Sequence, residues 1–231
     1  MKKYAMLARA LLCLLALPGC RDENDRGGGS STSAKPVIYL YPDADRSDDV
    51  ADAKPVVCLY PEATLDVTVT LDYDGELTCA YPAYDGGWHV AAAPDGTLTD
   101  ANGQTYNYLY WEGVTDVEYD FSQGFCVAGA DTAAFLEDAL ARLGLTRREA
   151  NEFIVYWLPQ MEGNAYNLIA FQSGAYTDHA RLTVEPAPDA ALRVFMAWTP
   201  LDAPIEIEAQ ALPAFARHGF TVVEWGGAKI G

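Results

Sequence analysis

The chain has 231 residues, of which half are hydrophobic and 12% aromatic, so it can build a sizeable core and wholesale disorder is excluded. Its 15 Lys and Arg and 33 Asp and Glu residues give a formal net charge of −18. Such a surface repels phosphate backbones, and no cluster of basic residues offsets it. We therefore expect no nucleic-acid partner and no polybasic docking on anionic lipid.

The first residues predict export and a lipid anchor. Residues 1–19 have a basic start and an apolar run over 10–17, which is too short to span a bilayer. The following run, Leu17-Pro18-Gly19-Cys20, resembles the lipobox of bacterial lipoproteins. That resemblance implies cleavage before Cys20 and lipidation of its thiol. It predicts a protein of the cell envelope, held on a membrane outside the cytoplasm and on the outer membrane where the host has one.

Two segments separate this anchor from the body of the protein. Residues 20–33 are charged and then rich in Gly and Ser, which predicts a flexible tether. Residues 34–52 hold a short β-rich motif bounded by prolines and an acidic linker. The motif of residues 34–42 recurs nineteen residues later as residues 53–61, where Cys58 replaces the Tyr39 of the first copy. We expect residues 53–231 to form the body.

The part of the body over residues 53–127 is predicted to be β-rich with hairpins. Apolar and polar residues alternate from Leu65 to Leu71, as in a strand with one buried face. Asp74-Gly75, Asp95-Gly96 and Asn102-Gly103 predict the hairpin turns that separate the following strands.

Residues 128–231 predict two or three helices and several strands. A helix with an apolar stripe follows Asp131 and ends at Gly144, and Thr146 with Glu149 makes a capping box for a second helix. We expect this second helix to change into a strand over 153–158, where β preference is strong, and a short helix to form over 211–217. Further strands are expected over 166–171, 181–184, 192–198 and 220–225. Strands and helices are segregated, so the prediction is an α+β fold packed as one compact unit.

Four strings in the body resemble an uncharacterised bacterial protein family. They are KPVVCLYP at 54–61, YLYWEG at 108–113, FIVYWLP at 153–159 and VVEWGG at 222–227. The resemblance covers roughly residues 53–231 and implies neither an activity nor catalytic residues.

Cysteine usage predicts one disulfide. Cys13 leaves with the signal peptide and Cys20 takes lipid, so three thiols remain, and two of them can pair outside the cytoplasm. We expect Cys79 and Cys126 to pair, because Cys58 has the character of a substitution within a strand.

Motifs for metals, cofactors and familiar catalysis are absent from the sequence. His89, His179 and His218 are isolated, and no His-x-x-x-His or Cys-x-x-Cys spacing suggests zinc. The Gly-x-Ser-x-Gly, Walker and dinucleotide glycine patterns do not occur. We expect no metal and no cofactor.

Two carboxylates flanked by aromatic residues are the candidates for chemistry. Glu112 and Glu224 could act as an acid/base pair on a glycosidic bond if apolar walls raised the pKa of one of them. We nevertheless expect a lipid-anchored envelope protein with a non-catalytic binding or structural role and a glycan or protein ligand. The alternative is a cell-envelope glycan hydrolase using Glu112 and Glu224, which a shared open pocket would distinguish.

Overall fold

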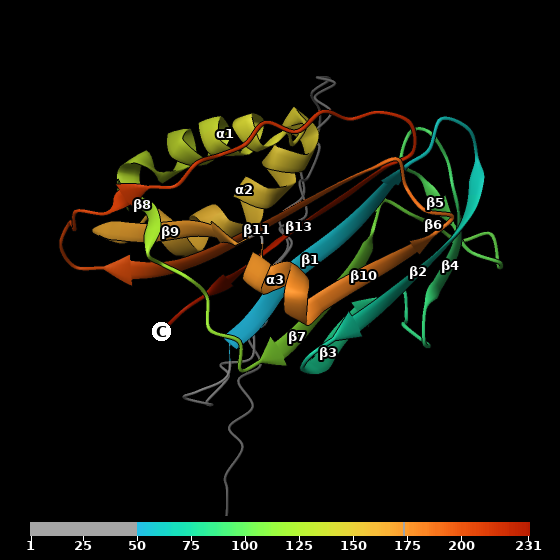
Figure 1. Cartoon of the computed structure of the whole chain (residues 1–231), viewed down its shortest axis with the longest axis horizontal. Coiled ribbons are helices and arrows are strands. Elements are labelled where there is room, and N and C mark those ends of the chain that lie inside the picture. The colour runs from blue at the N-terminus through green and yellow to red at the C-terminus, as the bar shows by residue number, and fades with distance from the viewer. Residues whose placement is uncertain (1–49, 173) are drawn as a thin grey trace, which may run out of the picture. The chain divides into compact units, whose positions relative to one another are not determined.

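Two β-sheets form most of the protein, which we describe from a computed structural model over residues 50–172 and 174–231 (Figure 1). The larger sheet has eight strands in the order β12-β8-β9-β11-β13-β1-β7-β3, and the smaller has five in the order β10-β2-β4-β5-β6. The strands are β1 Val50–Tyr60, β2 Leu65–Tyr73, β3 Glu76–Tyr81, β4 Trp88–Ala92, β5 Leu98–Thr99, β6 Thr105–Tyr106, β7 Leu109–Thr115, β8 Gln123–Ala128, β9 Tyr166–Gln172, β10 Ala180–Glu185, β11 Ala190–Leu201, β12 Glu208–Ala209 and β13 Thr221–Lys229. The helices are α1 Thr132–Leu143, α2 Arg147–Met161 and α3 Gly174–His179, with a 3₁₀ turn at Gly129–Asp131.

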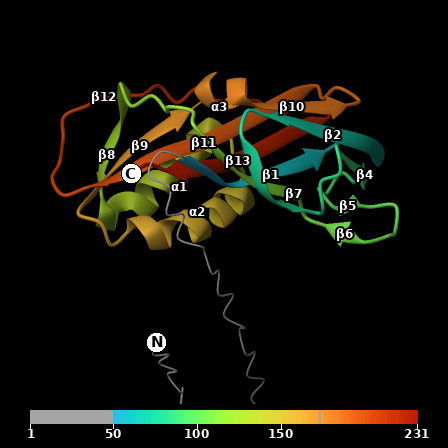
Figure 2. The ribbon, with the colours of Figure 1, turned by 90° about the horizontal axis from the view of Figure 1, so that it is seen from below.

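The large sheet is the middle layer of the fold. Its first face is covered by α1 and α2, which bury one apolar cluster against it. Its second face packs against the small sheet and α3 over another apolar cluster. Figure 2 shows α1 and α2 below the large sheet and α3 above it. This segregation of helices and strands is the α+β class that the sequence predicts.

Strand β1 is an interior strand of the large sheet. It pairs antiparallel with β13 on one side and with β7 on the other. Val56, Val57 and Leu59 have no exposed surface. Successive side chains of a strand point to opposite faces, so Val56 belongs to the helix-side cluster and Val57 and Leu59 to the other. Both apolar layers therefore depend on this strand.

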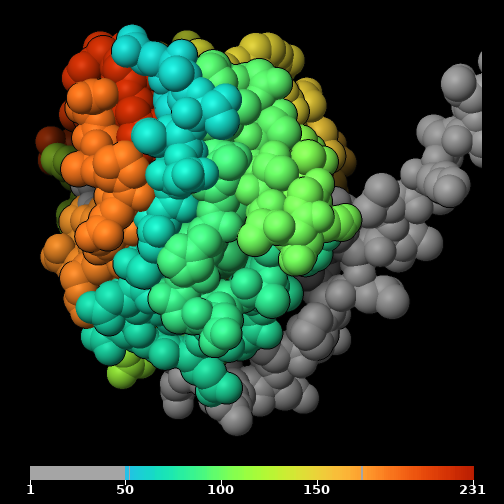
Figure 3. All heavy atoms as spheres, turned by 90° about the vertical axis from the view of Figure 1, so that its right-hand side faces the viewer, coloured from blue at the N-terminus to red at the C-terminus, as the bar shows by residue number. Residues whose placement is uncertain are grey.

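Two of the three predicted hairpin turns are confirmed. The turns around Gly96 and Gly103 join β4 to β5 and β5 to β6 within the small sheet, at an end of the molecule that Figure 3 shows in cyan to green. The prediction for Asp74-Gly75 was wrong, because β2 belongs to the small sheet and β3 pairs with β7 in the large one. That turn is a corner between sheets. A Cβ at Gly75 would lie 2.4 Å from the carbonyl oxygen of Val114, so the close approach requires glycine.

Helix α2 begins as predicted but continues further. Thr146 Oγ1 accepts from the Glu149 amide at 3.3 Å, and Glu149 Oε2 accepts from the Thr146 amide at 2.7 Å, which completes the capping box. The predicted change to a strand was wrong, and the helix runs on to Met161. Burial of Phe153 and Trp157 on one helical face outweighs the β preference of the segment.

A long connection, which we call the strap (residues 202–220), joins β11 to β13. The short helix predicted over 211–217 does not form. Seven residues make a marginal helix, and this segment instead packs Leu212 and Phe215 against the helix-side cluster. The strap adds β12, which pairs in parallel with β8 at the sheet edge.

The described residues, 50–172 and 174–231, belong to one compact unit. Cys20, the predicted signal peptide and tether, and the first copy of the repeated motif lie outside the described residues. Within the described part, no helix has the length and apolar character needed to cross a bilayer.

Candidate functional site

The two candidate glutamates lie on opposite faces of the large sheet. Glu224 of β13 bonds to Trp111, whose side chain belongs to the cluster beneath the small sheet. Glu112 follows Trp111 on β7 and therefore points the other way, on the face where Tyr110 packs against the helix-side cluster. A layer of backbone separates the two carboxyl groups. The pairing proposed for glycoside hydrolysis is therefore wrong, because its acid and base must flank one bond.

Glu224 is instead half of a buried ion pair. Its side chain has no exposed surface, its Oε2 accepts from Arg193 Nε at 2.5 Å and its Oε1 accepts from Trp111 Nε1 at 3.3 Å. Burial alone would lower the pKa of Arg193, but the carboxylate of Glu224 outweighs burial and raises it, so the guanidinium stays charged. Glu224 thus balances the charge of Arg193 and orients its guanidinium inside the fold.

Aromatic side chains continue this network toward α3. The guanidinium of Arg193 lies 4.8 Å from the ring centroid of Tyr176, and that ring stacks on Phe195 at 4.0 Å. His179 is also buried, with Nδ1 at 2.7 Å from the carbonyl oxygen of Ala175 and Nε2 at 3.3 Å from the Tyr119 hydroxyl. These contacts fix α3 and β11 together.

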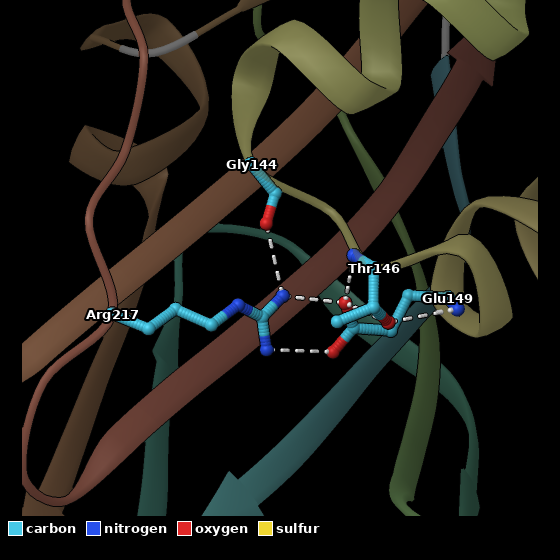
Figure 4. Close-up of polar contacts among 4 residues, drawn as sticks. All are labelled: Gly144, Thr146, Glu149 and Arg217. Carbon is cyan, nitrogen blue, oxygen red and sulfur yellow. Dashed lines mark hydrogen bonds and ion pairs between the residues drawn. The ribbon is translucent and has the colours of Figure 1, made fainter.

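A second ion pair holds the strap to the helices (Figure 4). Arg217 donates to the two carboxylate oxygens of Glu149 at 3.1 and 2.5 Å, and to the carbonyl oxygen of Gly144 at 3.0 Å. Burial would raise the pKa of Glu149, but the hydrogen bonds from Arg217 and Thr146 outweigh it and lower the pKa. The capping glutamate of α2 is therefore also the anchor of the strap.

The other end of this stretch of strap is held by Gln210. Its side-chain amide donates to the Phe171 carbonyl at 2.6 Å and accepts from the Phe171 amide at 2.8 Å, as a neighbouring strand would. Hydrogen bonds of Gln210 and Arg217 therefore hold residues 211–216 at both ends.

A cavity of about 200 Å³ lies between this stretch and the large sheet. It is mainly apolar, with a few polar groups, and it is lined by Leu143, Phe171, Gln172, Leu192, Arg193, Val194, Phe195, Gln210, Ala211, Leu212, Pro213, Ala214 and Phe215. We call it the strap cavity. Strand β9 pairs with β11 only from Phe195 to Leu201. Within the described ranges, no strand pairs with the β9-side edge of residues 190–194, so that edge faces the cavity.

A smaller cavity, of about 120 Å³, lies at the start of α2. It is bordered by Cys58 and Tyr60 of β1, Tyr108, and Glu149 and Glu152 of α2. Burial and the nearby carboxylate of Glu149 raise the pKa of Cys58 to about 12, so its thiol stays protonated near neutral pH and is a poor nucleophile.

The predicted disulfide is wrong. Cys79 lies on β3 at one end of the large sheet and Cys126 on β8 near the other, with five strands between them. Six inter-strand spacings of about 4.8 Å put the two strands roughly 29 Å apart, whereas bridged Cα atoms lie within about 7 Å. Cys58, Cys79 and Cys126 are all free.

The histidines serve local contacts in the described structure. His89 lies 3.0 Å from the Thr68 hydroxyl on the small sheet, and His218 lies in the strap. Over residues 50–172 and 174–231, no group of three potential ligand side chains could hold a metal ion.

The strap cavity was not predicted from sequence. It depends on where β9 ends relative to β11 and on a loop that folds back from residues 202–220. The one local signal was the apolar sequence Leu212-Pro213-Ala214-Phe215, which lies within the segment predicted to form a short helix over 211–217.

The comparisons with known proteins place the chain in a family. No family model and no solved structure matches it. It is 36% identical over 116 residues to the "Uncharacterized protein in bglA 3'region" of Butyrivibrio fibrisolvens, a match that covers 49% of this chain and 99% of that protein. The chain therefore belongs to the same protein family as this uncharacterised Butyrivibrio fibrisolvens protein.

Proposed function

We propose that the protein is a lipid-anchored envelope protein with a non-catalytic binding role, and that its body captures a short extended peptide at the strap cavity. The observation that carries this proposal is the coincidence of an apolar cavity with a strand edge that lacks a strand partner among the described residues. Extended peptides bind such edges through main-chain hydrogen bonds and gain specificity from side-chain pockets beside the edge.

The size and lining of the cavity suit a single apolar side chain. Its volume of about 200 Å³ is below the range of roughly 300–1,000 Å³ typical of small-molecule sites. Leu192, Val194 and Phe215 offer little to the hydroxyl groups of a sugar. A peptide that lays its backbone along residues 190–194 and inserts one aliphatic or aromatic side chain fits both features.

Charge supports a neutral or basic peptide. The whole chain carries a formal net charge of −18, and removal of residues 1–19 would leave 12 basic and 33 acidic residues, or −21. A partner with acidic flanking residues would be repelled, whereas a basic one would be steered toward the surface in a salt-dependent way.

The glycan hydrolase alternative loses its stated mechanism. Glu112 and Glu224 point to opposite faces of the sheet, and Glu224 is engaged by Arg193. We therefore propose binding without turnover.

A displayed library of random short peptides, selected on the purified protein without residues 1–20, tests the proposal. Ala214→Trp should block the cavity, because Ala214 lines it on the strap. Ala216→Trp is the matched control, since Ala216 is an exposed alanine of the same strap that does not line the cavity. Selected peptides should lose at least tenfold in affinity for the first variant and keep their affinity for the second. Peptides that bind both variants as tightly as the wild type would contradict this location.

A further inference from the structure

The sequence of most of β1, an interior strand of the large sheet, occurs twice in the chain. Residues 53–61, which supply the end of β1, repeat residues 34–42 with differences at two positions only. Ile38 corresponds to Val57, and Tyr39 corresponds to Cys58. Every other residue of the first copy is identical to its counterpart in the second.

The residues that make β1 essential are present in both copies. Val56 and Leu59 are fully buried on opposite faces, and their counterparts are Val37 and Leu40. Tyr60, which lies opposite Thr221 of β13, corresponds to Tyr41. The first copy therefore has the alternating apolar pattern that a strand between β13 and β7 requires.

The cavity beside Cys58 fits the residue that the first copy would place there. A tyrosine side chain extends beyond a cysteine by most of a phenol ring, and the cavity bordering Cys58 measures about 120 Å³. A cavity of about 150 Å³ in another protein binds benzene. The carboxylates of Glu149 and Glu152 border the same space and can accept a hydrogen bond from a phenol hydroxyl. At the other difference, Ile38 would add one methylene group at the position where Val57 is fully buried, which is a cost in stability. The first copy therefore combines a gain at Tyr39 with a cost at Ile38.

We propose that residues 34–42 are an alternative β1, which exchanges with residues 53–61 of the same chain for the position between β13 and β7. In the alternative arrangement, the side chain of Tyr39 fills the cavity that borders Cys58, and residues 43–64 become the loop that leads to β2. The direction of the chain is unchanged, and loop closure becomes only slightly less favourable because its entropy falls with the logarithm of loop length.

The exchange would shorten the tether of the body. With residues 53–61 in the sheet, the segment that links Cys20 to the sheet includes residues 34–52. With residues 34–42 in the sheet, the linking segment ends at residue 33. This consequence rests on the proposed lipidation of Cys20. The exchange itself depends neither on that anchor nor on the peptide site.

Disulfide trapping detects which copy occupies the sheet. We start from the chain without residues 1–20, which lie outside the compact unit, and carry Cys58→Ser, Cys79→Ser and Cys126→Ser throughout. Tyr60 and Thr221 lie directly opposite each other in an antiparallel pair, where Cα separations of about 4.5–5.5 Å allow a disulfide. Thr221→Cys is therefore combined with Tyr60→Cys to report the second copy, or with Tyr41→Cys to report the first, which leaves Tyr39 intact.

After mild oxidation with diamide, we expect an intramolecular disulfide in monomers of both pairs. Leu40→Cys with Thr221→Cys is the control, because Leu40 corresponds to Leu59, which faces the other side of the sheet. A disulfide that forms from position 60 but not above the control level from position 41 would overturn the proposal. A disulfide from position 41 that joins two molecules would overturn exchange within a chain and show strand donation between copies.

Two deletions in phase with the repeat test whether each copy suffices. Deleting residues 43–61 joins the first copy directly to Glu62, and deleting residues 34–52 leaves the second copy alone. We expect the first deletion to fold cooperatively with a melting temperature at least equal to that of the second, because Tyr39 fills the cavity. Failure of the 43–61 deletion to fold would overturn the proposal whatever the other deletion does.

Discussion

Replacing Glu224 by glutamine should strongly destabilise the protein. Glu224 is fully buried, and the side chain of its partner Arg193 is only 15% exposed. The glutamine keeps the shape of the side chain and an acceptor for Trp111, but it leaves the guanidinium without a counter-charge. Breaking a buried ion pair in this way costs about 3–5 kcal/mol. For a domain of this size, that lowers the melting temperature by roughly 6–20 °C.

The matched control is Glu112→Gln. Glu112 directly follows Trp111 in β7, so its side chain points to the face of the large sheet opposite Glu224, where it is half-buried. Urea unfolding followed by tryptophan fluorescence should give an unchanged slope for both variants and a much lower midpoint for Glu224→Gln alone. Combining Arg193→Met with Glu224→Leu should recover most of the loss, because no charge is then left unpaired. A Glu224→Gln effect no larger than that of Glu112→Gln would refute the reasoning.

Three further predictions follow from other parts of the chain. Cys20→Ser should move the protein from the membrane fraction to the soluble fraction and abolish acyl labelling; labelling equal to the wild type would contradict lipidation at this residue. Because the pKa of Glu149 is lowered in the folded state, its contribution to stability should be complete above its ordinary pKa of 4.5 and should be lost as the pH falls through the lowered value. The urea midpoint of Glu149→Gln should therefore fall less on acidification than that of the wild type. Equal falls in the two proteins would contradict this role of Glu149. Cys58→Tyr should raise the free energy of unfolding by about 1–2 kcal/mol. Filling 120 Å³ of dry apolar cavity would contribute roughly 3 kcal/mol, and the gain is smaller here because the lining is polar. A lower urea midpoint would show that the ring does not fit.

Local signals predicted local structure well. The capping box of Thr146 and Glu149 and the turns at Gly96 and Gly103 act within a few residues, and the structure contains all of them. Where a local preference competed with burial, the prediction was wrong. The β-prone end of α2 remains helical because Phe153 and Trp157 lie on its buried face, and Leu212 and Phe215 dock an irregular strap rather than a helix.

The candidate site depended on information that the sequence did not supply. Glu112 and Glu224 were paired by their similar surroundings, but the face of each is set by the register of β7 and β13 on either side of β1. Cys79 and Cys126 were paired by elimination, whereas the strand order places them near opposite ends of the large sheet. Arg217 gave no signal as a partner of Glu149, because 68 residues separate the two.

Hydrogen–deuterium exchange with a selected peptide tests the proposed function most directly. Backbone pairing at the strap cavity predicts that the peptide slows amide exchange in residues 190–194, and that burial of its side chain slows exchange in residues 211–215 of the strap. The Ala214→Trp variant should show neither effect, and Ala216→Trp should show both. Peptide binding that leaves residues 190–194 unprotected, or protects another part of the protein instead, would contradict the account.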